Sequence, residues 1–393
     1  MKVFAKDLGE LVKASLENRK PIVTGEKPSV NKLISFGNVN HMAYLILTSA
    51  LNAWEWDENE AATLKTGVMR CMYTTAVQIC EQKRLETILE ARGVRFLMMK
   101  GAILRNMFPR VEQREMGDID LLIYPECFSD AERVLLENKY TVIEDIKQHK
   151  IFRSPTGVVV EAHHTLCDRV TDKNMYEYFL DYSRHELKEG TKYTYRMTNE
   201  DFYIYLLAHM ARHFYVKGCG VRNLIDIYIY NNVMAGKLDR QYIEAELAKI
   251  GILDFTIQME KLSRVWLENE ESSEVLDNTL EYMLEGGSYG FDYNGIWSRF
   301  AKLDLEDYSR KALKRCYYFP PLAYMSEKYP ELEEHVWLLP FFWIRRGWET
   351  IFSSKKQRGK KEERRHHVDD VDDATIKKMS EIYKNMNFNF SSH

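Results

Sequence analysis

Apolar residues recur at three- and four-residue spacing through the beginning of the chain, in the segments 3–16, 31–54 and 58–93. This spacing places apolar side chains along one face of an α-helix. Gly93 ends the last segment, and glycine is typical of the position just after a helix. The pattern predicts a helical N-terminal region over residues 1–92. Within it, His41 and Trp54 are more typical of core packing than of substrate contact.

The pattern changes at residue 94 to short apolar runs separated by helical segments. Strands are predicted for VRFLMMK (94–100), DIDLLIY (118–124), YTVIEDI (140–146) and VVVEAHH (158–164). A Pro-Thr-Gly turn separates IFRS from the last run, which predicts a hairpin. SDAERVLLENK is predicted to be an amphipathic helix with Ser129 as its cap. The fold class is therefore α+β, with a small mixed sheet and flanking helices over residues 93–194.

Helical spacing returns beyond residue 195, in segments that include 199–218, 221–237 and 239–251. We expect a helical C-terminal domain over residues 195–352. The following stretch, SSKKQRGKKEERRHHVDDVDD, is a basic run followed by an acidic run, which is typical of a solvated linker. Residues 353–393 are therefore predicted to be a charged linker and tail, whose last twenty residues are expected either to add one more helix or to remain disordered.

Composition limits the location and the partners of the protein. The 393 residues include 55 basic and 59 acidic side chains, and the net charge of −4 disfavours polymeric nucleic acid as a partner. The six cysteines form no CxxC pair, which is typical of reduced thiols. No apolar run reaches the roughly 18 residues that cross a bilayer, and the N-terminus lacks a signal-like apolar core. A cytoplasmic protein without a transmembrane segment is expected.

Three carboxylates fall on the predicted strands. Side chains two apart share a face of a strand, so Asp118 and Asp120 are expected to point the same way. Glu161 joins them if its strand is adjacent. Clustered carboxylates repel one another unless a cation lies between them, and Mg²⁺ prefers such oxygen ligands. We expect these three acids to be catalytic and to bind two Mg²⁺ ions, with Mn²⁺ as an alternative, for phosphoryl transfer.

Residues suited to phosphate binding precede these acids in the chain. Lys100 and Gly101 end the first predicted strand and open a short predicted helix, whose free backbone N–H groups attract phosphate. Glycine allows a phosphate to approach the backbone closely. Arg114 offers a forked cation to a triphosphate. These residues are the candidate nucleotide-binding set, which His163 joins because it shares a strand face with Glu161.

These motifs together resemble the DNA polymerase β-type nucleotidyltransferase superfamily, and more narrowly its branch of uncharacterised bacterial nucleotidyltransferases. The resemblance rests on Lys100-Gly101, Arg114, Asp118-Ile-Asp120 and Val160-Glu161-Ala-His163. It implies a polymerase β-like core in which the two aspartates bind metal, the glutamate is the third carboxylate and the glycine turn holds the nucleotide phosphates. The superfamily turn is usually Gly-Ser or Gly-Gly, whereas this chain has Lys-Gly-Ala. Looser similarities to the branch extend over most of the chain, in residues 209–213, 226, 286–290 and 318–346.

Further candidates for the nucleotide or acceptor cleft are His149, His209, His213 and Asp226. His209 and His213 are four residues apart and share a helix face, a spacing used by metal ligands. With Asp226 they are expected to line the cleft, or alternatively to form a buried histidine network that donates to Asp226. A zinc protease is excluded, because methionine follows His209 where that motif requires glutamate.

Two other motifs compete with this assignment. GGSYG (286–290) matches a nucleophile elbow around Ser288, but a helix is predicted before it, whereas the elbow requires a strand. The aromatic segment VWLLPFFWIRRGWETIF (336–352) precedes a basic run, a combination found in interfacial membrane anchors. Helix packing is the favoured interpretation of that segment.

The sequence therefore predicts a Mg²⁺-dependent nucleotidyltransferase. It would move a nucleoside monophosphate from a nucleoside triphosphate, by default ATP, to a hydroxyl of a small-molecule or protein acceptor and release pyrophosphate. One alternative is a degenerate relative that binds a nucleotide or a partner without catalysis. Another is a metal-dependent phosphohydrolase built on His209, His213 and Asp226. The acceptor and the oligomeric state do not follow from the sequence.

Overall fold

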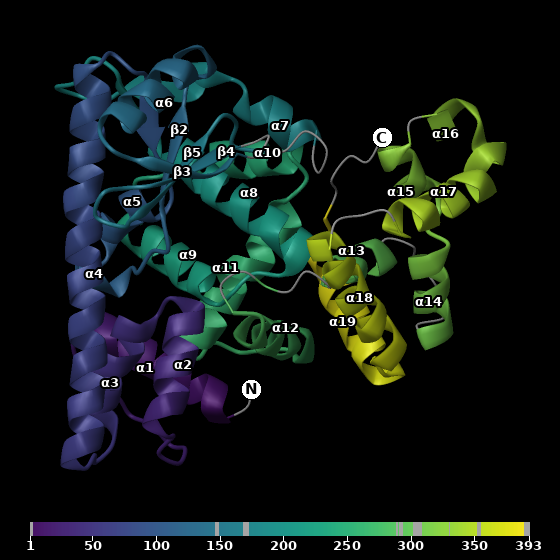
Figure 1. Ribbon diagram of the computed structural model, residues 1–393. Helices are drawn as coiled ribbons and strands as arrows, with labels where there is room; N and C mark the ends of the chain where they lie inside the picture. Colours follow the sequence, from purple (N-terminus) through teal and green to yellow (C-terminus); the bar gives the residue numbers. More distant parts are fainter. Residues whose placement is uncertain are drawn as a thin grey trace.

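A computed structural model describes residues 3–145, 149–167, 173–287, 290, 294–301, 309–329, 331–351 and 355–388. The fold is α+β, as predicted: one seven-stranded mixed sheet lies among helices that come from both sides of it in the sequence (Figure 1). In the part of the chain that the structure describes, no helix combines the length and the apolar character that a bilayer crossing requires.

The N-terminal region is helical, as predicted. Its helices are α1 (Val3–Glu17), α2 (Val30–Asn40), α3 (Ala43–Ala53) and α4 (Glu58–Ala91). The amphipathic segment 31–54 is divided by His41, which ends α2 with a φ of 51°. A capping box between Asp57 and Glu60 begins α4, and Gly93 follows its end with a φ of +72°. The long α4 runs beside both the sheet and the other N-terminal helices (Figure 1).

The sheet contains the predicted strands and two further ones. The strands are β1 (Phe96–Met98), β2 (Ile119–Ile123), β3 (Thr141–Asp145), β4 (His149–Arg153), β5 (Val159–His163), β6 (His185–Leu187) and β7 (Thr194–Met197). Their order is β3-β4-β5-β2-β1-β7-β6. The predicted hairpin is present between β4 and β5, which pair antiparallel around Gly157 at a φ of +87°. The strands β6 and β7 were not predicted, because they are short and carry charged residues.

Helices complete the fold around the sheet and beyond it. Those between the strands are α5 (Gly101–Leu104), α6 (Phe128–Glu137) and α7 (Lys173–Phe179). Short 3₁₀ turns are η1 (Arg105–Met107), η2 (Val111–Gln113), η3 (Pro125–Cys127) and η4 (Tyr182–Arg184). Ser129 lies within α6 rather than capping it, because η3 leads directly into a helix that begins at Phe128.

The C-terminal half is helical, as predicted. Its first helices are α8 (Asn199–Lys217), α9 (Arg222–Val233), α10 (Arg240–Lys249), α11 (Leu253–Glu268) and α12 (Glu274–Glu285). They are followed by α13 (Gly295–Ala301), α14 (Arg310–Tyr318), α15 (Leu322–Lys328), α16 (Glu331–Glu334), η6 (Val336–Leu338) and α17 (Leu339–Ile351).

Segment 353–393 is more helical than the charged linker and tail that we expected, and it includes the further helix that was one alternative for the last twenty residues. It contains the helices α18 (Lys355–Asp370) and α19 (Asp373–Met386). Ile376, Ile382 and Met386 of α19 are fully buried. These apolar residues recur at helical spacing, in agreement with the alternative of a further helix, whereas the basic and acidic runs before them did not indicate α18.

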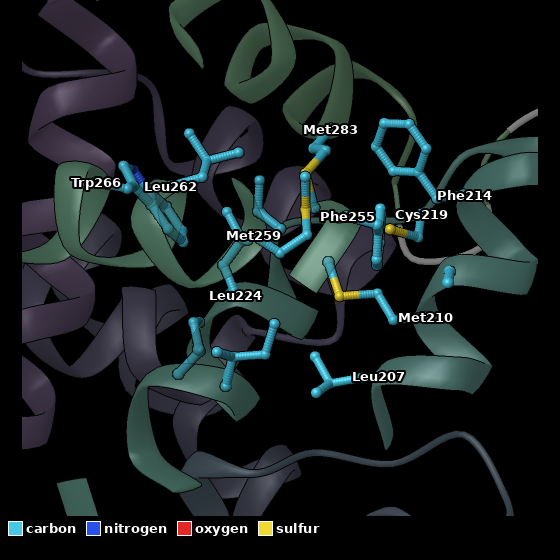
Figure 2. Packing of buried hydrophobic residues seen from close by; sticks show 14 of the residues in the cluster. Leu207, Met210, Phe214, Cys219, Leu224, Phe255, Met259, Leu262, Trp266 and Met283 are labelled. Atoms are coloured by element: carbon cyan, nitrogen blue, oxygen red, sulfur yellow. The ribbon is translucent and has the colours of Figure 1, made fainter. Parts of the chain in front are cut away.

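One large apolar core joins elements from every predicted region. It includes residues of α1, α3, α8, α9, α11, α12 and α19. Figure 2 shows part of it, where Met210, Leu224, Met259 and Met283 lie together. A second core lies between the sheet, α4 and α6. The domain boundaries after residues 92, 194 and 352 stay predictions, since the first core extends across all of them.

Candidate functional site

Two adjacent parallel strands bring the predicted acids together. The register of β2 and β5 places Asp120 directly opposite Glu161, and Asp118 immediately precedes β2. Ile119 and Leu121, which alternate with the two aspartates, are fully buried in the core between the sheet, α4 and α6. Burial of the apolar residues therefore fixes the strand register that aligns the carboxylates.

Asp120 lies between the side chains of Lys100 and His163. Lys100 Nζ lies 2.6 Å from Asp120 Oδ1, and His163 Nε2 donates to the same oxygen at 2.9 Å. Burial opposes ionisation of Asp120, but Lys100 and His163 outweigh it and hold its pKa well below the usual range. Burial also opposes the charge of His163, yet its contacts with Asp120 and Glu161 raise its pKa. Asp120 is therefore a buried carboxylate with fixed charge.

The pKa of Asp118 is raised by its burial and by the neighbouring acids. Burial, followed by the nearby carboxylates of Asp120 and Glu161, raises the pKa of Asp118 to about 7. Lys100 and Arg222 act in the opposite direction without cancelling this effect. Like charges that disfavour ionisation of one another indicate a place where an added cation is stabilised.

A set of ligand atoms suited to a metal ion lies at this point. Among the described residues, one group of carboxylates and imidazoles is close enough to hold an ion: Asp120, Glu161 and His163, with ligand atoms within 4.8 Å of one another. The predicted ligands were Asp118, Asp120 and Glu161. This group contains His163 in place of Asp118. His209, His213 and Asp226 form no such group in the described part of the chain.

Arg114 is engaged by Asp226. Its Nε and Nη2 lie 2.5 and 2.8 Å from the two carboxylate oxygens of Asp226 on α9, and both side chains are buried. Arg114 Nη1 also donates to the backbone carbonyl of Glu115 at 2.6 Å. The guanidinium predicted to bind phosphate therefore connects the segment before β2 to α9.

The turn after β1 is closely packed around Gly101. Lys100 adopts a φ of 44°, and its side chain turns toward Asp120. A Cβ atom on Gly101 would clash with Met116 and lie 3.5 Å from Arg114 Nη1. Close packing therefore favours glycine at position 101. The backbone conformation does not require it, because the φ of Gly101 is not positive.

The predicted histidines lie around the acids. The rings of His149 and His163 are 5.0 Å apart, across the β4–β5 pair. His209 and His213 on α8 face each other with their Nε2 atoms 3.0 Å apart. Burial, and then nearby Lys100, lowers the pKa of both, to about 3 for His213, so they are neutral.

The predicted alternative for the α8 histidines, a network that donates to Asp226, is not what the described residues show. Asp226 accepts hydrogen bonds from Arg114. His209 and His213 instead lie near Lys100, whose charge affects both of their pKa values. The two histidines and Asp226 therefore belong to different parts of the site.

Arg222 and Tyr205 were missed in the sequence. Arg222 on α9 is close enough to lower the pKa of Asp118, and its Nη1 donates to the Glu115 carbonyl at 3.1 Å. Tyr205 on α8 is buried beside Lys100 and Asp120. Arg222 and Asp226 are four residues apart on one helix, so the spacing of VRNLID was a usable signal.

The remaining predicted candidates lie as follows. His41 lies near Arg222 and Arg114, and burial together with these cations lowers its pKa to about 4. Trp54 packs against Trp56 with ring centroids 6.1 Å apart, in agreement with a packing role. Ser288 lies outside the described residues, and helix α12 occupies the position where a nucleophile elbow requires a strand.

Comparison with known proteins gives one result for this site. A family model described as "Uncharacterised nucleotidyltransferase" matches residues 32–268, which include every candidate residue described above except Ser288. No curated protein and no solved structure matches the chain.

Proposed function

Because the chain belongs to this family of uncharacterised nucleotidyltransferases, we propose that it transfers a nucleoside monophosphate from a nucleoside triphosphate to an acceptor hydroxyl. The observation that carries the proposal is the alignment of Asp120 and Glu161 on neighbouring parallel strands, with Asp118 beside them. ATP is the donor that we propose, because it is abundant. The acceptor is a small molecule or a protein, since the net charge of −4 disfavours polymeric nucleic acid.

The donor set fits a divalent cation. We propose that Asp120 and Glu161, with Asp118 as the further carboxylate, hold Mg²⁺, and that Mn²⁺ is an effective substitute, with the deprotonated Nε2 of His163 as an additional ligand. When bound, the metal neutralises charge on the transferring phosphate and lowers the pKa of the attacking hydroxyl. Burial raises the pKa of Asp118 most, and the carboxylates of Asp120 and Glu161 add to this effect, which supports a cation at this place.

Cationic side chains of the protein would offset the negative charge of the triphosphate. Lys100 and Arg222 are close enough to the acids to affect the pKa of Asp118, so we propose that they contact phosphate oxygens. Arg114 is instead a positioning residue in this proposal: it and Arg222 donate to the same Glu115 carbonyl.

The transfer itself needs one proton acceptor. The acceptor hydroxyl oxygen forms a bond to the α-phosphorus, the bond from that phosphorus to pyrophosphate breaks, and the hydroxyl proton passes to a base. We assign that base to Glu161, which is less enclosed than Asp120. The neutral imidazoles of His209 and His213 lie on the α8 side and would bind the acceptor.

Calorimetric titration with a non-hydrolysable ATP analogue and Mg²⁺ tests the proposal. We expect binding that requires Mg²⁺ and is lost in the Asp118→Asn, Asp120→Asn double variant. Asp130→Asn is the matched control, because Asp130 is an exposed aspartate on α6 that pairs only with nearby Arg133 among the contacts described. If the wild-type protein binds none of the four nucleoside triphosphate analogues, the alternative of a degenerate partner-binding protein replaces the transferase.

A further inference from the structure

Helix α17 exposes a stripe of large apolar side chains to solvent. Trp337 in η6 and Phe341, Ile344 and Trp348 in α17 are 76%, 59%, 61% and 59% exposed. Their spacing of four, three and four residues places them along one face of a helix. We call these four residues the apolar stripe. Exposed patches of this kind mark interaction surfaces.

The opposite face of α17 is already used. Phe342 is buried with Met325, Tyr329 and Leu332 in a small separate core, and Trp343 packs at its edge. Trp343 Nε1 also donates to the carbonyl of Pro320 at 2.9 Å. Helix packing, the favoured sequence interpretation, therefore accounts for one face of α17, while the side chains of the apolar stripe remain more than half exposed. In Figure 1, α14 to α17 form a lobe away from the sheet, with α18 and α19 between them and the body.

Charge around the stripe indicates what covers it. Residues 345–365 contain nine Lys or Arg and three Glu, a net charge of +6 in a chain whose net charge is −4. Helix α18, which carries most of these cations in its sequence, contacts α17. Arg345, next to the stripe, is 48% exposed. An apolar face rich in tryptophan and phenylalanine beside a basic segment matches the surface of an anionic bilayer, where aromatic rings enter the headgroup region and cations meet lipid phosphates.

We propose that the apolar stripe and the neighbouring basic segment form a docking surface for anionic phospholipid membranes. The helix lies in the plane of the interface and does not cross the bilayer. This inference is independent of the proposed transferase activity, because it involves no residue of the acidic site. From the sequence, an interfacial anchor was one interpretation of residues 336–352. The proposal specifies which face of α17 meets the membrane and that the lipids are anionic.

Vesicle co-sedimentation of the full-length protein tests the proposal. We expect sedimentation with vesicles of phosphatidylcholine containing about one third phosphatidylglycerol, and much less with phosphatidylcholine alone. The partition coefficient of the Phe341→Ser, Trp348→Ser variant should be lower than that of the wild-type protein by a factor of about ten or more. The control is Met69→Ser, Tyr73→Ser on α4, which removes exposed apolar side chains (68% and 73% exposed) from a helix without a comparable basic flank.

Three results would overturn the proposal. They are no sedimentation of the wild-type protein with either vesicle, equal binding to both vesicles, and unchanged binding of the stripe variant. Light scattering without lipid identifies the other occupant of the stripe: a dimer that the stripe variant loses, in a protein that ignores vesicles, would show a surface for a second copy. Circular dichroism should be the same for all variants, since the substituted side chains are exposed.

Discussion

At the residue scale, the groups beside the acidic cluster are held by buried charged partners. The pair of Arg114 and Asp226 joins side chains that are only 6% and 9% exposed. Removal of one partner from such a pair leaves a buried charge without compensation, which is far more costly than the loss of an exposed ion pair.

Asp226→Asn should therefore lower the free energy of unfolding by about 3 kcal/mol or more. Glu137→Gln is the matched control, because the ion pair of Glu137 with Arg92 is 47% and 46% exposed and its loss should cost less than about 1 kcal/mol. Denaturant unfolding of both variants measures these values. If Asp226→Asn weakens nucleotide binding and leaves stability unchanged, Arg114 is a phosphate ligand and not a positioning residue.

Glu115 gives a pH dependence of stability that can be tested. Burial raises its pKa from 4.5 to about 7, although it accepts the Tyr44 N–H at the start of α3 at 2.6 Å. The unfolded chain ionises first as the pH rises, so the folded state loses stability between about pH 4.5 and 7. Glu115→Gln should remove on the order of 2–3 kcal/mol of that loss.

Unfolding free energies at pH 5 and about pH 8 measure this effect, as the difference between wild type and variant. Glu112→Gln, a nearby glutamate in η2, serves as the control and should leave the wild-type pH dependence in place. A Glu115→Gln protein with the wild-type slope would show that Glu115 is ionised in the folded state at pH 5.

At the element scale, the pattern of apolar residues was sufficient for the long helices and the central strands. The segments 199–218, 221–237 and 239–251 became α8, α9 and α10 with boundaries close to those predicted. The strands β6 and β7 could not be predicted, because residues such as Glu186 and Arg196 interrupt any apolar alternation. Their pairing depends on the neighbouring strand β1, which is a tertiary contact.

Replacing a helical glycine by alanine can raise or lower the stability of the protein, depending on what surrounds the glycine. A Cβ on Gly37 in α2 would lie 2.7 Å from the Ala43 backbone in α3, whereas a Cβ on Gly347 in α17 meets nothing within 4 Å. Gly37→Ala should therefore destabilise the protein by about 1–3 kcal/mol. Gly347→Ala should stabilise it by up to about 1 kcal/mol, because alanine favours the helix.

Thermal unfolding of the two glycine variants, each compared with the wild-type protein, checks this contrast. The expected changes in melting temperature have opposite signs. Equal melting temperatures for Gly37→Ala and the wild-type protein would mean that α2 and α3 separate without cost, and that the tight contact between them contributes little to stability.

At the scale of the whole molecule, segments from the two ends of the chain share one core. Trp266 of α11 donates its indole N–H to the Ala5 carbonyl of α1 at 2.9 Å. Tyr383 of α19 donates to the carbonyl of Phe214 on α8 at 2.8 Å, the helix that carries the site histidines. The C-terminal helix thus supports the part of the molecule that holds the candidate acceptor site.

Ile382→Ala in α19 should consequently lower the free energy of unfolding by about 2–5 kcal/mol. Ile382 is fully buried in the large core, in the segment that the sequence indicated to be a tail. Lys377→Ala is the control on the same helix, because its side chain is 71% exposed and its replacement should change stability by less than about 0.5 kcal/mol. Equal unfolding curves for the two variants would show that α19 is not part of the cooperative unit.

The sequence by itself determined the α+β class, the central strands and the shared strand face of Asp118 and Asp120. Local periodicity alone decides which face of a strand carries Asp118 and Asp120, so these features needed no tertiary information. The tertiary structure decided which partners meet: Lys100 and His163 at Asp120, and Arg114 at Asp226. Contacts between residues far apart in the chain depend on how helices pack against the sheet, and no short stretch of sequence encodes that packing.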